Sequence, residues 1–286
     1  MPHRRMTEFR QQVNGVMLHG VAAGPEDGPL VILLHGFPEF WWGWRHQIAP
    51  LAKSGLRVVV PDQRGYNLSQ KPLGVLSYDL DTLAADVVAL AEAHGGRNFR
   101  VVGHDWGGLV AWWTATRHPD RVERLAVLNA PHPAVAGSYL ALNPSQLVRS
   151  SYIGFFQLPW LPEAVLRANG FAPIRHALLQ SSRPGTFSEE DLARYEAAWS
   201  EPGALTAMLN WYRALRGRPQ IRDARVSVPT LVIWGEEDRF LEKGLAEASL
   251  ALCESARPVW FDTASHWVHL EEAQDVSDEL AEFLKP

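Results

Sequence analysis

Eight residues, Val101-Val102-Gly103-His104-Asp105-Trp106-Gly107-Gly108, constrain this chain more than any others. The apolar, β-branched run at 99–102 predicts a buried strand, and the apolar run at 109–115 predicts a helix. Glycines on both sides of Asp105 allow a sharp turn between the two, because a Cβ there would collide with the tight backbone. A strained strand-to-helix turn of this kind presents one side chain over the end of the sheet, and here that side chain is the Asp105 carboxylate.

A carboxylate at this turn implies a particular chemistry. It is a nucleophile without the help of a general base, and it attacks saturated carbon to give an alkyl ester that must then be hydrolysed. The strand–nucleophile–helix turn is typical of the α/β-hydrolase fold, where the usual nucleophile is serine. Because a glycine-rich turn alone is weak evidence, the interpretation depends on partners elsewhere in the chain.

Composition excludes several classes of protein. The chain has 286 residues, of which 47% are hydrophobic, so it is long enough for one α/β domain with an insertion. Its net charge of −5, with both signs spread along the sequence, argues against a nucleic-acid partner. No apolar run is long enough to span a membrane, and Met1–Glu8 lacks the apolar core of a signal peptide, so we expect a cytoplasmic protein. The single cysteine, Cys253, excludes an intrachain disulfide, and without zinc-ligand or phosphate-loop motifs we expect no cofactor or metal.

The remaining pattern alternates strands and helices. Asn14-Gly15 predicts a hairpin turn within residues 7–22. Buried strands are predicted at 30–34, 56–60, 99–102, 122–128, 229–234 and 258–261, and helices at 41–53, 79–94, 243–253 and 271–283. Residues 133–224 show helical patterns broken by prolines instead. We therefore predict a mostly parallel eight-stranded sheet flanked by helices (residues 1–132 and 225–286) with an inserted helical cap (133–224).

Two further residues follow later strands in the order that this fold uses, namely nucleophile, acid and histidine. Asp238 follows the predicted strand at 229–234, and His266 follows the last strand. We expect His266 to activate water against the ester. Asp238 would hold the imidazole in the correct tautomer and stabilise its cation.

Alternatives exist for both positions. His269 lies three residues beyond His266, but it falls beside the last helix and is better interpreted as structural. Glu236 and Glu237 are alternative acids next to Asp238. The other acid position of this fold, after the strand at 122–128, holds Asn129, which carries no charge.

Two segments after strands complete the core. His35-Gly36-Phe37-Pro38-Glu39 follows the strand at 30–34, where this fold places one amide of its oxyanion hole. We expect the amides of Phe37 and Trp106 to form that hole. Asp62-Gln63-Arg64-Gly65-Tyr66 follows the next strand, and we interpret Arg64 as a structural link between loops. His104 is expected to support the turn.

With these motifs in place, the chain resembles the α/β-hydrolase-fold epoxide hydrolases over nearly its whole length. The resembling segments are His35–Glu39, Asp62–Tyr66, Lys71-Pro72, Gly103–Gly108, Glu237-Asp238 and His266-Trp267. The resemblance implies conversion of a small apolar epoxide and water to a vicinal diol through an ester on Asp105. It says nothing that separates a monomer from a homodimer.

The cap carries the features that distinguish this family. Segments 151–159 and 209–213 resemble those that hold two tyrosines, here Tyr152 and Tyr212, which donate hydrogen bonds to the epoxide oxygen. An alkoxide is a poor leaving group unless it is protonated or hydrogen-bonded, and a phenol can do this in an apolar pocket. The expected substrate contacts are Phe37, Pro38, Trp106, Trp211 and Trp267.

Haloalkane dehalogenases share the core, including an Asp-Trp turn, and are the alternative class. A halide leaves as a stable anion and needs N–H donors rather than an acid. Phe37 offers no side-chain donor where dehalogenases often place Asn, but Trp160, Trp199 and Trp211 are tryptophans of the cap that could donate. A non-catalytic small-molecule receptor on the same fold is the third possibility.

Overall fold

The computed structural model describes residues 6–215 and 224–285. Within them a single sheet has eight strands in the order β1-β2-β4-β3-β5-β6-β7-β8. The first two pairings, β1 with β2 and β2 with β4, are antiparallel, and the other pairings are parallel. The predicted α/β-hydrolase architecture is therefore confirmed. The strands are β1 Thr7–Val13, β2 Val16–Ala23, β3 Leu30–Leu34, β4 Arg57–Pro61, β5 Phe99–His104, β6 Val122–Leu128, β7 Thr230–Gly235 and β8 Ala256–Phe261.

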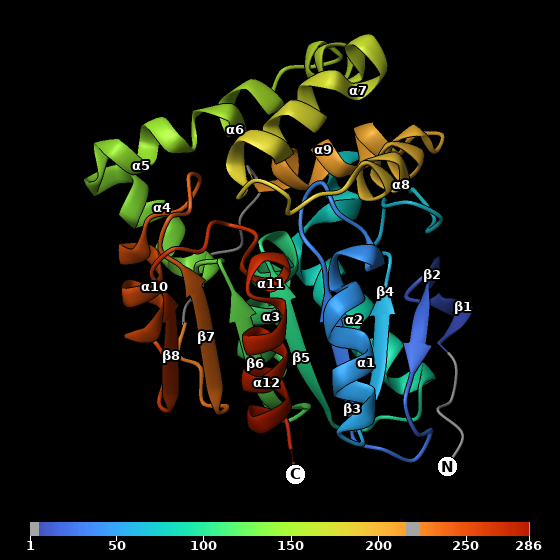
Figure 1. Cartoon of the computed structure of the whole chain (residues 1–286). Helices are drawn as coiled ribbons and strands as arrows, with labels where there is room; N and C mark the ends of the chain where they lie inside the picture. The colour runs from blue at the N-terminus through green and yellow to red at the C-terminus, as the bar shows by residue number, and fades with distance from the viewer. Residues whose placement is uncertain (1–5, 216–223, 286) are drawn as a thin grey trace.

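Helices cover both faces of the sheet (Figure 1). On one face α1 packs against α12, and on the other α2 packs against α3. Two hydrophobic clusters form the core, and alternate residues of β3 belong to different clusters. Val31 and Leu33 pack in one cluster, and Ile32 and Leu34 pack in the other. The helices that flank the sheet are α1 Arg45–Lys53, α2 Leu80–Ala93, α3 Trp106–Arg117, α10 Lys243–Leu250, α11 Val268–Glu271 and α12 Ala273–Phe283.

Three of the predicted helices are shorter than expected. The predicted helix at 41–53 begins with a 3₁₀ turn, Trp41–Trp44, before α1. The predicted helix at 271–283 is two helices, because the backbone of Glu272 leaves the helical region between α11 and α12. The helix predicted to reach Cys253 ends at Leu250, since Cys253 forms a parallel bridge with Val226.

A second group of helices lies between β6 and β7 and covers the carboxyl ends of the parallel strands (Figure 1). We call it the cap: α4 Pro133–Leu142, α5 Pro144–Arg149, α6 Ser151–Phe156, α7 Leu161–Ser181, α8 Glu189–Ser200 and α9 Ala204–Ala214. Its first helix begins at Pro133, the first residue of the predicted cap. Its predicted end at 224 follows residues 216–223, which lie outside the described residues, as do 1–5 and 286. The division into two domains stays a prediction.

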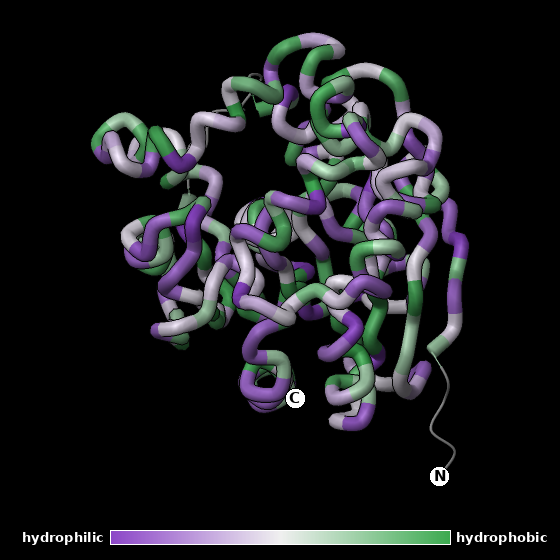
Figure 2. Tube along the Cα trace, turned by 45° about the horizontal axis from the view of Figure 1, so that its top comes forward, coloured by the Kyte–Doolittle hydropathy of each residue, from purple (hydrophilic) through white to green (hydrophobic). Residues whose placement is uncertain are grey.

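Hydropathy follows this arrangement. Figure 2 shows hydrophilic and hydrophobic residues alternating along the outer helices, as expected for helices that bury one side. In α12, for example, Val276 and Leu280 are buried against the core. Across residues 6–215 and 224–285, the helices lack the combination of length and hydrophobicity that crossing a membrane requires.

Arg64 has the structural role that the sequence predicted, but it links its loop to helix α2 and to the turn between β1 and β2. Its Nε and Nη2 donate to the two carboxylate oxygens of Asp86 at 2.7 and 2.6 Å, and Nη2 also donates to the Asn14 carbonyl at 3.2 Å. Both side chains of the ion pair are buried. Burial raises the pKa of Asp86 even with Arg64 beside it, so the carboxylate depends on this partner.

Arg64→Met should lower the free energy of unfolding by roughly 3 kcal/mol, because it leaves the Asp86 carboxylate buried without its cation. Urea denaturation at pH 7 measures the change. The control is Arg64→Met with Asp86→Leu, which removes both charges and should lose less stability than the single variant. A larger loss in the double variant would contradict the interpretation.

Candidate active site

Asp105 occupies the sharp turn between β5 and α3, with a strained backbone at φ 50° and ψ −120°. Gly107 and Gly36 lie so close to neighbouring segments that neither position has room for a Cβ. A Cβ on Gly107 would lie 2.2 Å from the Leu34 carbonyl oxygen, and a Cβ on Gly36 would lie 2.4 Å from the Asp105 Cβ. The turn therefore presses α3 against the end of β3 and brings the 35–39 loop beside the carboxylate.

The surroundings of Asp105 favour its charged form. The Phe37 amide donates to Oδ1 at 2.8 Å, and Nε2 of His266 lies 3.5 Å from Oδ2. Burial alone would raise the pKa of Asp105, but the hydrogen bond and charge of His266, together with His104 and the Phe37 amide, lower it below its usual value. The predicted second amide, that of Trp106, stays a prediction.

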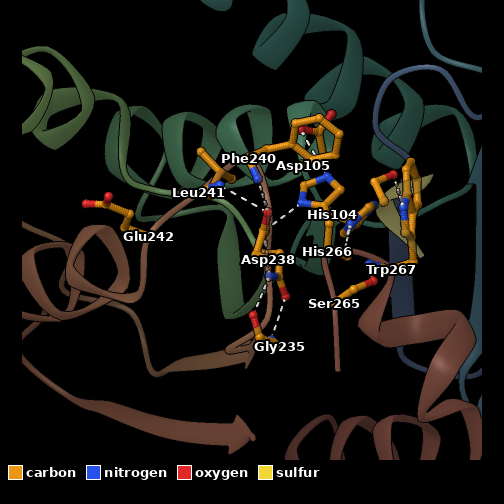
Figure 3. A network of polar contacts seen from close by, with 12 residues as sticks. His104, Asp105, Gly235, Asp238, Phe240, Leu241, Glu242, Ser265, His266 and Trp267 are labelled. Carbon is orange, nitrogen blue, oxygen red and sulfur yellow. Dashed lines mark hydrogen bonds and ion pairs between the residues drawn. The ribbon is translucent and has the colours of Figure 1, made fainter. Parts of the chain in front are cut away.

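His266 connects Asp105 to Asp238 (Figure 3). Its Nδ1 lies 2.7 Å from Oδ2 of Asp238. Asp238 is itself held by amides, because its Oδ1 accepts from the backbone N–H groups of Phe240 at 2.7 Å and Leu241 at 3.0 Å. The three predicted residues, Asp105, Asp238 and His266, thus lie in one chain of contacts, brought together from three loops at the carboxyl end of the sheet.

The alternative residues lie elsewhere. His269 faces Glu39, with Nε2 3.3 Å from its Oε2, and burial helps to lower the pKa of His269 to about 4. Glu236 pairs with Lys243 at 2.6 Å, and Glu237 is exposed. The structure therefore brings His266 and Asp238, rather than their neighbours, to Asp105.

Asn129 has a part that sequence reasoning missed. It occupies the alternative acid position, and its Nδ2 donates to Oδ2 of Asp238 at 2.8 Å. Its Oδ1 accepts from the Gly235 amide at 2.9 Å. Asn129 therefore orients the carboxylate that faces His266. The sequence contained a signal for this role, because Asn129 and Asp238 occupy the two acid positions of the fold. A side-chain amide in one position can donate a hydrogen bond to a carboxylate in the other.

Glu39 is a second residue that sequence reasoning left without a role. Its Oε1 accepts from the Tyr195 hydroxyl at 2.8 Å, and Nδ1 of His104 lies 3.2 Å from its Oε2. His104 in turn donates from Nε2 to the His266 carbonyl at 2.8 Å, which agrees with its expected supporting role. Burial alone would raise the pKa of Glu39, but His269 and His104 hold it well below its usual range.

Donor atoms of Glu39, His104 and His269 lie within 4.8 Å of one another, so among the described residues this is a group with the composition of a metal site. All three side chains are fully enclosed and directed at one another. Glu39 and its two histidines therefore connect the 35–39 loop, the Asp105 turn and the segment that contains His266, and these contacts stabilise the positions of all three.

Tyr152 of α6 and Tyr212 of α9 face the site from the cap. Their ring centroids lie 6.0 Å apart, and the ring centroid of Trp106 lies 4.9 Å from that of Tyr212. Burial, helped by the nearby Asp105 charge, raises the pKa of both phenols. Both tyrosines are therefore neutral hydrogen-bond donors at physiological pH.

Two cavities meet at Asp105, Tyr152 and Tyr212. The larger has a volume of about 310 Å³ and the smaller about 100 Å³. Both are lined mainly by apolar side chains, so the site suits uncharged, apolar groups on either side of the carboxylate.

The predicted substrate contacts are distributed unevenly. Phe37, Pro38 and Trp267 line the larger cavity, and Trp106 lines the smaller one. Trp211 lines neither: its Nε1 donates to the Arg64 carbonyl at 3.0 Å, and its ring packs behind Trp106. Because the Trp211 side chain points about 100° away from that of Tyr212 around α9 and lines neither cavity, a direct substrate contact for Trp211 is not supported.

Comparison with known proteins agrees with this geometry. A family model described as alpha/beta hydrolase fold matches residues 29–273. This chain belongs to the α/β-hydrolase fold family. It is 50% identical over 273 residues to the AB hydrolase superfamily protein YfhM of Bacillus subtilis (strain 168), covering 95% of this chain and 96% of that protein.

Within the α/β-hydrolase family, several relatives are named epoxide hydrolases, so the resemblance predicted from the motifs is confirmed. The chain is 39% identical over 278 residues to Epoxide hydrolase 4 of Mus musculus, covering 95% of this chain and 77% of that protein. The crystal structure of a Bacillus megaterium epoxide hydrolase in complex with an inhibitor matches with a TM-score of 0.88 at 30% identity, covering 96% of this chain and 99% of that one.

Asp105→Asn should lower the pKa of His266. Burial alone would lower that pKa, but Asp238 and Asp105 raise it to about 10, and the substitution removes one of the two anions. Because the folded pKa exceeds the ordinary value of 6.5, imidazole protonation stabilises the fold fully below pH 6.5, and this contribution is lost as the pH rises toward 10. NMR titration of the imidazoles measures the shift.

His269, which faces Glu39 instead of Asp105, is the internal reference for this titration and should keep its lowered pKa. An unchanged His266 titration in the variant would contradict the assigned contact.

Proposed function

We propose that this protein is an epoxide hydrolase that adds water to an apolar epoxide and releases a vicinal diol. The observation that carries the proposal is the pair of neutral cap phenols, Tyr152 and Tyr212, bordering the same two cavities as the Asp105 carboxylate. Relatives with epoxide hydrolase names support the same activity.

In the first step the Asp105 carboxylate attacks one carbon of the epoxide. The carbon–oxygen bond of the ring breaks, and the ring oxygen takes up negative charge as the ester forms. Tyr152 and Tyr212 donate hydrogen bonds to that oxygen, and one of the two phenols transfers its proton to it to give the hydroxyl group and is then reprotonated from solvent. Their donor role is essential, because an alkoxide in an apolar cavity has no water to stabilise it.

In the second step water cleaves the ester. Ester formation removes the Asp105 charge, and the pKa of His266 falls because one of the two anions that raise it is gone, so the imidazolium releases its proton to solvent. Neutral His266 takes a proton from water, whose oxygen attacks the ester carbonyl carbon while the Phe37 and Trp106 amides stabilise the oxyanion. Asp238 stabilises the imidazolium, the departing diol oxygen takes the second proton of the attacking water, and the carboxylate re-forms as the diol leaves. Side chains and backbone amides of the chain supply the groups that act on substrate and water in this route.

The alternative dehalogenase chemistry finds fewer donors in this site. The indole N–H of Trp199 donates to the Pro38 carbonyl at 2.6 Å, and that of Trp211 donates to the Arg64 carbonyl. Trp160 is 74% exposed on the outside of the cap. These cap tryptophans are therefore not directed at a departing halide. A non-catalytic receptor would not require nucleophile, base and acid to converge as they do here.

Tyr212→Phe and Tyr152→Phe should each slow epoxide opening, and the double variant should nearly abolish it. Each change removes a hydrogen bond that strengthens in the transition state, worth about 2–4 kcal/mol. Diol formation from styrene oxide measures the effect. Halide release from 1-bromobutane, assayed in parallel, tests the dehalogenase alternative. Wild-type turnover of styrene oxide by the double variant would refute the assignment.

His266→Gln should form the ester on Asp105 but fail to hydrolyse it, because water is not deprotonated without His266, whereas the Phe37 amide still binds the Asp105 carboxylate. Intact-protein mass spectrometry after mixing with styrene oxide should show a covalent adduct, located to the peptide that contains Asp105. His269→Gln is the matched control and should not accumulate adduct. The reverse result, with adduct only in the His269 variant, would exchange the two assignments.

A further inference from the structure

We infer that Arg213 is a positioning residue for the two tyrosines, acting through the cap segment 156–163. The inference rests on the proposed function, since it concerns the step that Tyr152 and Tyr212 assist.

The Arg213 side chain binds this segment at three points. Its Nε donates to the Phe156 carbonyl at 3.0 Å, and its Nη2 donates to the Leu158 carbonyl at 2.8 Å. Its Nη1 and Nη2 also pair with both carboxylate oxygens of Glu163, at 2.7 and 3.0 Å. In addition, Nε2 of Gln157 donates to the Tyr212 carbonyl at 3.0 Å. Two consecutive residues of α9 thus hold the segment.

The segment needs such an anchor because the backbone is interrupted within it and again shortly after it. Trp160 has a left-handed backbone (φ 50°) directly before α7. Within α7, Asn169, Gly170 and Phe171 all have positive φ, so the first part of the helix is not continuous with the rest. Helix geometry therefore cannot transmit the position of the flanking elements to residues 161–167, and side-chain contacts must fix it.

Phe156 links this anchor to the site. Its ring centroid lies 5.5 Å from that of Tyr152, 5.0 Å from that of Tyr212 and 5.7 Å from that of Phe37. It therefore packs against both phenols and against the residue whose amide binds Asp105. Because Arg213 holds the Phe156 backbone, a shift of Arg213 moves the ring against which both tyrosines rest.

The Arg213–Glu163 ion pair also has a tightly restricted geometry. The two side chains are 13% and 17% exposed, and the planar guanidinium donates to five acceptor atoms at once, the fifth being Oδ1 of Asn210. Burial alone would raise the pKa of Glu163, but the hydrogen bond from Arg213 lowers it, so the pair stays ionised. Lysine keeps the charge but lacks the fork that makes these bonds.

A positioning role for the tyrosines separates the two steps of the reaction. Ring opening depends on Tyr152 and Tyr212, whereas ester hydrolysis depends on His266 and Asp238, which Arg213 does not contact. Loss of the Arg213 contacts should slow ester formation and leave ester hydrolysis unchanged, whereas a general loss of structure would slow both.

The test is Arg213→Lys with styrene oxide in single-turnover reactions, quenched at intervals and analysed by intact-protein mass spectrometry for ester formation and decay. Ester formation should fall about tenfold, in line with the cost of small misplacements at an active site, and ester decay should stay within about twofold. The matched control is Arg175→Lys, another arginine of the cap that pairs with two glutamates, Glu189 and Glu196. It should change neither rate.

A second background tests whether the effect passes through the tyrosines. With Tyr212→Phe in place, Arg213→Lys should slow ester formation by less than about threefold, because coupled changes are not additive. If Arg213→Lys does not fold, Glu163→Gln, which keeps the bonds of Arg213 to Phe156 and Leu158, should give a smaller decrease in ester formation alone.

An equal loss of both rates in Arg213→Lys, unchanged ester formation, or the full tenfold effect in the Tyr212→Phe background would overturn the inference. Failure of the proposed function gives a different result, in which the wild-type protein forms neither ester nor diol from the epoxide.

Discussion

The buried charge of Asp105 is the constraint on which the site depends. A carboxylate enclosed among apolar side chains would normally become protonated, and it would then lose its nucleophilicity. Here the Phe37 amide and His266 hold it as the anion. Those two partners require the 35–39 loop and the loop after β8 to meet at one turn, and the glycines around Asp105 permit that approach. His104 also connects these loops, because it contacts the Glu39 carboxylate and donates a hydrogen bond to the His266 carbonyl.

The cap and the core are joined through the loop that carries Asp238. Nη1 of Arg149 donates to the Asp238 carbonyl at 2.6 Å, and Nε2 of Gln146 donates to the Phe240 carbonyl at 2.7 Å. On the other side, Nε1 of Trp267 donates to Oγ of Ser181 at 3.0 Å. Since these bonds connect cap helices to the residues beside His266, the position of the phenols and that of the base are set by one packed unit.

Much of the core could be predicted because the relevant signals are local. β-branched runs fixed the strands, Asn14-Gly15 fixed the hairpin, and the glycines around Asp105 fixed the sharp turn. Parallel strands bring their carboxyl ends to one edge, so residues that follow them converge regardless of the loops between. That rule led from the chain order to Asp238 and His266. Helix ends were less predictable, because the break at Glu272 depends on packing rather than on composition.

The sequence by itself determined the fold class and predicted that Asp105, Asp238 and His266 lie together, because these features depend on short segments and on the geometry of a parallel sheet. Only the tertiary structure decided which cap side chains face the carboxylate. Trp211 was expected there, but the rotation of α9 turns Trp211 toward Arg64 and Tyr212 toward Asp105. The contacts of Arg213, Asn129 and Glu39 join residues far apart in the chain, and such pairings arise from how the cap packs on the core, which no local pattern records.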